Sequence, residues 1–231
     1  MSTQDNESTW RQSLERLGQA ALDLVSDLGG RVGSHEGPTA SGTTVTETRD
    51  VSGFTQVKLS GFGTLHIAQT GTESLTISAD ESVMPYLTSD VINGTLELGA
   101  KARLSFKLNA RPVYTVTVKS LEGIQLTGAG AITAADIRAS AFSVAISGAG
   151  DLTISGGAQS QSVKISGAGN YNAKDFATDE TEVKISGAGN AHVSASQTLN
   201  AAISGAGVVT YYGSPQVTQR TTGIGSVKQG S

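Results

Sequence analysis

The chain has 231 residues, a hydrophobic fraction of 37% and a formal net charge of −4. Its length suffices for a folded domain with a thin core. Because its net charge is negative, it has no overall positive potential to attract phosphate groups, so neither nucleic acid nor a membrane is an expected partner. Because the sequence has no Cys, disulfides, thiolate metal sites and cysteine nucleophiles are excluded. The 29 Gly, with only 4 Pro and 5% aromatic residues, indicate a backbone that turns often and packs small side chains.

The first segment, residues 1–9, is polar and is expected to be a disordered start. No apolar run anywhere approaches the roughly 20 residues that span a bilayer. The segment carries no secretion signal, so a cytoplasmic location is the expectation if this start is genuine.

Residues 10–28 carry a heptad pattern that predicts an amphipathic α-helix. Ser8 or Thr9 could cap its start, and Gly29 and Gly30 would end it. The helix either covers an open end of the following domain or joins several copies of the chain in a short coiled coil, which makes the chain itself a candidate partner. The apolar stripe consists of Trp10, Leu14, Leu17, Ala21, Leu24 and Leu28.

Residues 29–42 are rich in Gly and Ser and predict a flexible linker. Its lone His35 has no second ligand at a metal-binding spacing.

From residue 43 onward, apolar and polar residues alternate with period two, which predicts strands buried on one face. The first strands are expected in TVTETRDV, FTQVKLSG, SLTISAD, TLELGAK and YTVTVKS. Asn93-Gly94 is a type I′ hairpin signal, so part of this region should pair antiparallel.

One motif, [IL]-[ST]-G-A-G, then occurs five times, with successive copies 20, 19, 20 and 18 residues apart. A period of about 19 residues is too short for helical repeats or propeller blades and fits one coil of a solenoid. We therefore predict that residues 43–231 form an all-β domain, a right-handed parallel β-helix. Its tight corners would be Gly-Ala-Gly, where glycine allows backbone angles denied to other residues. The corner glycines are Gly128, Gly130, Gly148, Gly150, Gly167, Gly169, Gly187, Gly189, Gly205 and Gly207.

The register of the motif predicts which side chains enter the core and which face outward. Inward ladders are expected at Val144, Val163 and Val183, at Ile146, Ile165 and Ile185, and at Ile132, Leu152, Tyr171, Ala191 and Val209. Outward ladders are expected at Thr127, Ser147, Ser166, Ser186 and Ser204, and at Thr133, Thr153, Asn172, His192 and Thr210.

The repeats, together with the stretches at residues 46–67 and 73–87, resemble the bacterial family described as "putative auto-transporter adhesin, head GIN domain". The similarity covers about residues 43–229 and includes the DVSGF opening, the ADE…PYL segment and the GAG corners in the same order. The resemblance implies a β-helical domain of unknown biochemical activity, usually in exported or lipid-anchored proteins, and an adhesive role.

The sequence predicts no enzyme, no cofactor and no metal site. Glycan-cleaving β-helices need a clustered acid and base, and Asp136, Asp151, Asp175, Asp179, Glu180 and Glu182 occupy different phases of the repeat. His66 and His192 share a phase but are expected to lie several coils apart. The expected function is structural or adhesive, with multivalent attachment to a glycan or cell-surface ligand or self-assembly; the alternatives are a polysaccharide-acting enzyme and a self-assembling filament scaffold.

Overall fold

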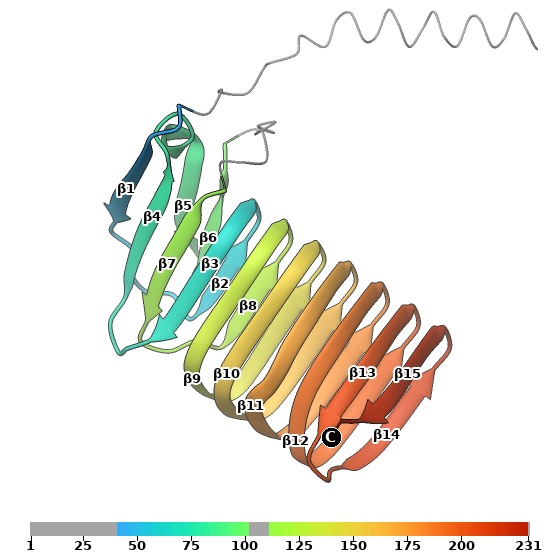
Figure 1. Ribbon diagram of the computed structural model, residues 1–231. Coiled ribbons are helices and arrows are strands. Elements are labelled where there is room, and N and C mark those ends of the chain that lie inside the picture. The colour runs from blue at the N-terminus through green and yellow to red at the C-terminus, as the bar shows by residue number, and fades with distance from the viewer. Residues whose placement is uncertain (1–40, 102–110, 231) are drawn as a thin grey trace, which may run out of the picture. The chain divides into compact units, whose positions relative to one another are not determined.

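The computed structural model describes residues 41–101 and 111–230, all of which belong to one compact unit (Figure 1). The start at residues 1–9, the helix expected at 10–28 and most of the linker at 29–42 lie outside the described residues. Within the described part, no helix is long and apolar enough to cross a membrane.

The described residues form strands and one short 3₁₀ helix. The strands of the amino-terminal part are β1 (Thr44–Arg49), β2 (Gln56–Leu59), β3 (Phe62–Gln69), β4 (Ser74–Asp80), β5 (Leu87–Ile92), β6 (Thr95–Ala100), β7 (Val113–Val118) and β8 (Gly123–Leu126). The repeat region contains β9 (Ala129–Ile146), β10 (Ala149–Ile165), β11 (Ala168–Ile185), β12 (Ala188–Ile203), β13 (Ala206–Tyr212), β14 (Gln216–Thr221) and β15 (Ile224–Gln229). The 3₁₀ helix η1 spans Met84–Tyr86.

The repeats stack in parallel, one coil on the next, as the period predicts. Each of β9 to β12 is long enough to bend and contribute to two walls: its first half continues the sheet of β3, and its second half continues that of β8. Here the first wall means β4, β7, β3, the first halves of β9 to β12, β13 and β15. The second wall means β5, β6, β2, β8, the second halves of β9 to β12, and β14. The domain is thus a parallel β-solenoid of about five turns, and this prediction is confirmed (Figure 1).

The amino-terminal end departs from simple winding. β3 lies between β7 and β9, so residues 62–68 are hydrogen-bonded neighbours of residues 129–135 although β4 to β8 lie between them in the sequence. β1, β4 and β7 pair antiparallel on one wall, and β5 and β6 form a hairpin on the other. Asn93 and Gly94 both have positive φ angles, 49° and 76°, as a type I′ turn requires, so the hairpin prediction is confirmed.

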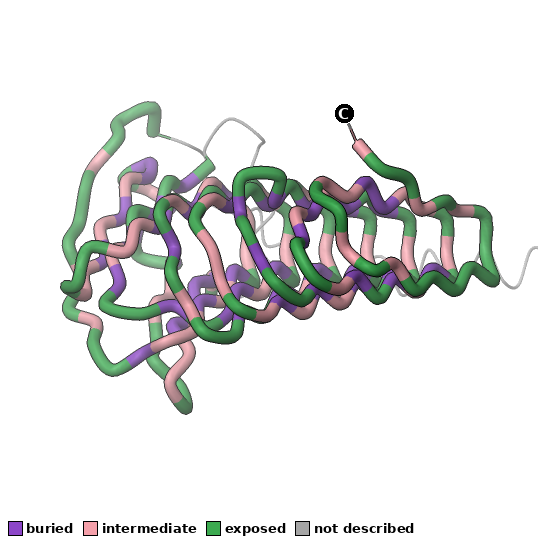
Figure 2. The backbone as a smooth tube through the Cα atoms, turned by 90° about the horizontal axis from the view of Figure 1, so that it is seen from below, coloured by how far each residue is buried: buried purple, intermediate pink, exposed green. Residues whose placement is uncertain are grey.

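The core is a stack of aliphatic ladders between the two walls. Every inward position predicted from the motif is buried, and the buried positions recur from coil to coil (Figure 2). Each buried aliphatic side chain contributes roughly 1.5–3 kcal/mol, and because neighbouring coils supply the contacts, stability depends on the stack. Phe142 and Phe176 add a ring pair with centroids 5.3 Å apart.

The motif glycines of consecutive coils stack on one another. The prediction that these positions need backbone angles denied to other residues is wrong. Gly148, for example, does not have a positive φ, and neither does any other of the ten. Instead, consecutive coils approach so closely that a Cβ atom would collide with backbone: on Gly167 it would lie 2.1 Å from the carbonyl oxygen of Gly148. Glycine is needed here for close approach between coils, not for a left-handed turn.

The last coil is polar at two positions where the preceding coil is aliphatic, while Val217 and Val227 continue the aliphatic ladders. In the register of the second wall, Gln219 is aligned with buried Ala201, and Thr221 is aligned with buried Ile203. Side chains of aligned residues in a parallel ladder point to the same face. The carboxyl-terminal end of the core therefore presents polar groups, as a terminal repeat of a solenoid must to remain soluble.

Candidate binding faces of the solenoid

The outward side chains form rows along the solenoid axis, largely as the motif predicts. The hydroxyl row of Thr127, Ser147, Ser166, Ser186 and Ser204 is exposed throughout. In the other row, Thr133, Thr153 and Asn172 are exposed, but Thr210 is buried, with 6% of its surface accessible. Thr210 lies between His192 and Lys228 in the ladder, and these longer side chains flank it.

Three residues of the first wall form a hydrogen-bonded ladder of carboxylate and amide groups. Asn170 donates from Nδ2 to Oδ1 of Asp151 at 2.9 Å, and Asn190 donates from Nδ2 to Oδ1 of Asn170 at 3.0 Å. The ladder ends where the backbone N–H of Val208 donates to Oδ1 of Asn190 at 3.2 Å. Each side chain is held by the next coil, so the remaining donors and acceptors are presented in fixed positions.

Aromatic rings lie at the carboxyl-terminal end of this ladder. The ring of Tyr212 stacks on that of His192, with centroids 6.3 Å apart and an interplanar angle of 24°. The ammonium group of Lys174 lies 4.9 Å from the centroid of Tyr212, within the range of a cation–π contact. Tyr212 is therefore held from two sides.

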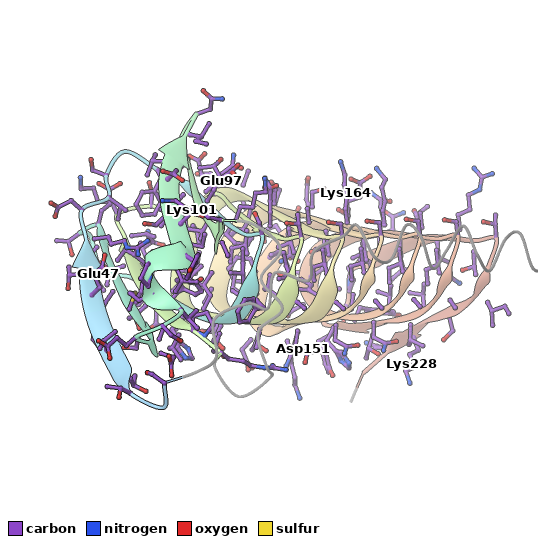
Figure 3. All side chains as sticks on the ribbon, turned by 90° about the horizontal axis from the view of Figure 1, so that it is seen from above. Glu47, Glu97, Lys101, Asp151, Lys164 and Lys228 are labelled. Carbon is purple, nitrogen blue, oxygen red and sulfur yellow. The ribbon has the colours of Figure 1, made fainter. Side chains whose placement is uncertain are left out.

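The ladder and the rings line one groove of about 790 Å³ on the first wall. We call this surface the amide face; it comprises Asp151, Thr153, Asn170, Asn172, Lys174, Asn190, His192, Tyr212 and Lys228. Figure 3 shows Asp151 and Lys228 on this side of the solenoid and Lys164 on the opposite side.

The second wall has a groove of its own, of about 830 Å³, lined with serine hydroxyls and carboxylates. Glu180 and Glu182 both line it, because residues two apart on a strand share a face. Glu180 and Glu182 therefore share a face of the second wall, although they occupy different phases of the repeat.

The chemistry around Glu182 is that of an ion pair. The ammonium group of Lys184 lies 2.6 Å from Oε1 of Glu182, and this hydrogen bond, with smaller contributions from Ser162 and Lys164, lowers the pKa of Glu182. A general acid of a glycosidase needs a raised pKa, so Glu182 is unsuited to that role at neutral pH.

The remaining candidates for metal chemistry lie apart. His66 and His192 occupy the same ladder position but are separated by Thr133, Thr153 and Asn172. Among residues 41–101 and 111–230, no three His, Asp or Glu side chains come together as a metal site would require.

The site residues predicted from sequence are placed as follows. The first glycine of each motif, such as Gly148, lies at a bend between the second wall and the first, and the second, such as Gly150, lies in the following strand. The helix stripe from Trp10 to Leu28 is outside the described residues.

From the sequence, Thr153, Asn172 and His192 of the amide face were expected to face outward, but the hydrogen-bonded ladder that ends at Asn190 and the position of Tyr212 were not predicted. The signal for the ladder was present, since the residue after GAG is Asp151, Asn170 and Asn190 in consecutive copies. No repeat pattern marks Tyr212, which lies near the end of β13.

Fold and faces together define a two-walled β-solenoid with polar grooves along its length. The family described as "putative auto-transporter adhesin, head GIN domain" matches residues 53–215, and the chain belongs to this family. No curated protein is similar in sequence to this chain.

Two solved structures share the fold. A putative adhesin from Bacteroides fragilis is similar over 84% of this chain and 100% of its own, with a TM-score of 0.68 and 20% identity. A putative adhesin from Parabacteroides merdae is similar over 84% of this chain and 98% of its own, with a TM-score of 0.51 and 19% identity. At these identities the likeness establishes the fold.

Proposed function

We propose that this chain is a non-catalytic adhesive module whose amide face binds neutral glycans. The observation that carries the proposal is the ladder from Asp151 through Asn170 to Asn190, which holds planar polar groups at the spacing of the coils. Sugar hydroxyls both donate and accept hydrogen bonds, so they match a surface of amide and carboxylate groups.

Tyr212 supports the same ligand class. A ring offers an apolar face to the C–H groups of a sugar, and its contacts with His192 and Lys174 keep it in place, which lowers the entropy lost on binding. Both structural relatives are named as putative adhesins, which agrees with attachment rather than turnover.

A glycan array tests this proposal directly. The wild type should bind neutral glycans weakly and with strong dependence on valency. Tyr212→Ala and the double variant Asn170→Ala/Asn190→Ala should lose this signal, while Tyr212→Phe, which keeps the ring, should retain most of it. Lys164→Ala, on the opposite wall, is the matched control. Equal binding by the wild type and Tyr212→Ala would refute the proposal that the amide face binds glycans.

Multivalency would come from the heptad segment at residues 10–28, which we propose joins several chains. Light scattering after size exclusion compares the full chain with a variant that lacks residues 1–42. An oligomeric full chain and a monomeric deletion variant would support assembly by this segment. The same number of subunits in both would refute it.

A further inference from the structure

Three cationic side chains lie in one row on the outside of the second wall. In the ladder register, Ala145, Lys164, Lys184, Ala202 and Arg220 are aligned from coil to coil. The side chains of Lys164, Lys184 and Arg220 all point outward and are exposed. We call Lys164, Lys184 and Arg220 the basic row.

The basic row lines a groove of about 670 Å³ that is separate from the amide face. Its other lining includes the hydroxyls of Ser166, Ser186 and Ser204. The short side chain of Ala202 leaves space between Lys184 and Arg220. Hydroxyl donors beside ammonium and guanidinium groups form a surface of hydrogen-bond donors suited to oxyanions.

One carboxylate opposes this surface. Glu182 is ion-paired with Lys184 at 2.6 Å, and both side chains are largely solvated, at 42% and 53% accessibility. Lys164 also lies close enough to act on Glu182 electrostatically. The patch therefore carries three positive charges and one negative charge, on a chain whose net charge is −4.

We infer that the basic row binds a linear acidic polysaccharide that lies along the solenoid axis. The cations succeed one another along that axis at multiples of the strand spacing of about 4.8 Å, so they match a chain with repeated carboxylates better than a single compact anion. No aromatic residue lines this groove, so it lacks the stacking platforms with which proteins hold the bases of single-stranded nucleic acid.

The test uses polygalacturonate as the acidic probe and dextran as the neutral polymer, with the full chain immobilised for biolayer interferometry. The wild type should bind polygalacturonate more tightly than dextran at low salt, and only the binding of polygalacturonate should fall as salt rises. Lys164→Glu and Arg220→Glu should each weaken binding about tenfold, because each reverses an exposed charge. Lys101→Glu, the same change at an exposed lysine that lines neither the basic row's groove nor the amide face, should have no effect.

Glu182→Gln provides the sharper result. This variant removes the carboxylate that occupies Lys184, so its affinity for polygalacturonate should rise severalfold while its fold is kept. Unchanged or weaker binding by Glu182→Gln, or full binding by Lys164→Glu, would overturn the inference. So would equal binding to duplex DNA or to phosphatidylserine vesicles, which would indicate a general attraction of anions.

The two proposals fail independently. Tyr212→Ala should retain binding to polygalacturonate, and Lys164→Glu should retain binding to neutral glycans.

Discussion

Gly148 lies directly against Gly128 of the preceding coil, and a Cβ atom on Gly148 would come within 1.9 Å of the Gly128 carbonyl oxygen. The same contact recurs between Gly167 and Gly148 at 2.1 Å and between Gly205 and Gly187 at 2.0 Å. Backbone hydrogen bonds accompany it: the N–H of Ala149 donates to the carbonyl of Gly128 at 3.1 Å. The repeated motif therefore encodes the distance between coils.

Replacing one of these glycines should separate two coils. In Gly167→Ala the new methyl group would meet the backbone of Ser147 and Gly148 in the preceding coil, so we expect a loss of about 3 kcal/mol or more in the free energy of unfolding. Urea unfolding followed by circular dichroism measures this loss.

Gly61→Ala is the matched control for that variant. Gly61 occupies the same position in Leu59-Ser60-Gly61-Phe62-Gly63, a divergent copy of the motif that precedes the five, but its nearest neighbour for a Cβ atom is the Cα of Gly99 at 3.4 Å. This substitution should cost no more than about 1 kcal/mol. Similar losses for both variants would refute the close-approach explanation.

Gln161 and Tyr171 form a buried polar pair whose removal should separate hydrogen bonding from packing. Gln161 donates from Nε2 to the hydroxyl of Tyr171 at 2.5 Å, while Oε1 of Gln161 is buried without a partner. Tyr171→Phe should cost about 1–3 kcal/mol, because Nε2 of Gln161 also loses its partner. The double variant Tyr171→Phe/Gln161→Leu should recover most of that loss. A double-mutant cycle by thermal unfolding measures the coupling, and strictly additive losses would contradict this account.

Acid should loosen the amino-terminal strand. Asp80 accepts hydrogen bonds from the Ser82 hydroxyl, from the backbone N–H groups of Ser41, Ser82 and Gly42, and from the Ser41 hydroxyl. The Ser82 hydroxyl is the main cause that lowers the pKa of Asp80 below its ordinary value of 3.8, with the backbone N–H groups of Ser41, Ser82 and Gly42 adding to it against desolvation.

Because the folded state lowers this pKa, the stabilisation is complete above about pH 4 to 5 and is lost as the pH falls through the folded value. Melting temperature should therefore drop steeply in acid for the wild type. Asp80→Asn should be less stable at pH 7 and should show a flatter acid limb. Parallel pH profiles for the two proteins would exclude this role.

The polar last coil should prevent association of solenoid ends. Gln219→Val/Thr221→Ile would continue the aliphatic ladders of Ala201 and Ile203 to the open end. We expect this double variant to self-associate with rising concentration in sedimentation velocity, because its new apolar patch has no covering coil. The matched control, Thr218→Val, alters an outward position in register with Asn200 and should not add to association. Filaments in the wild type would favour the scaffold alternative.

The ladders could be predicted because a parallel stack repeats one local rule. Val144, Val163 and Val183 are aligned in sequence by the motif and in space by the register. The hairpin at Asn93-Gly94 was equally local, since both residues carry the left-handed angles of its turn.

Other features depend on tertiary contacts that no local pattern reveals. The stacking of Gly128 on Gly61 requires the chain between them to leave the stack and return. The sequence repeats also identified the motif glycines. They did not reveal why glycine is required there, because the distance between coils is set by neighbouring chain segments. The burial of Thr210 and the placement of Tyr212 beside His192 arise in the same way.

The most direct test of a non-catalytic adhesive module is to incubate the protein with a neutral oligosaccharide that it binds on an array, and to record complex and products by mass spectrometry. The account predicts a complex with intact oligosaccharide that is lost in Tyr212→Ala. Release of shortened oligosaccharides, abolished by Glu180→Gln or Glu182→Gln, would contradict it and establish the second-wall groove as a catalytic site.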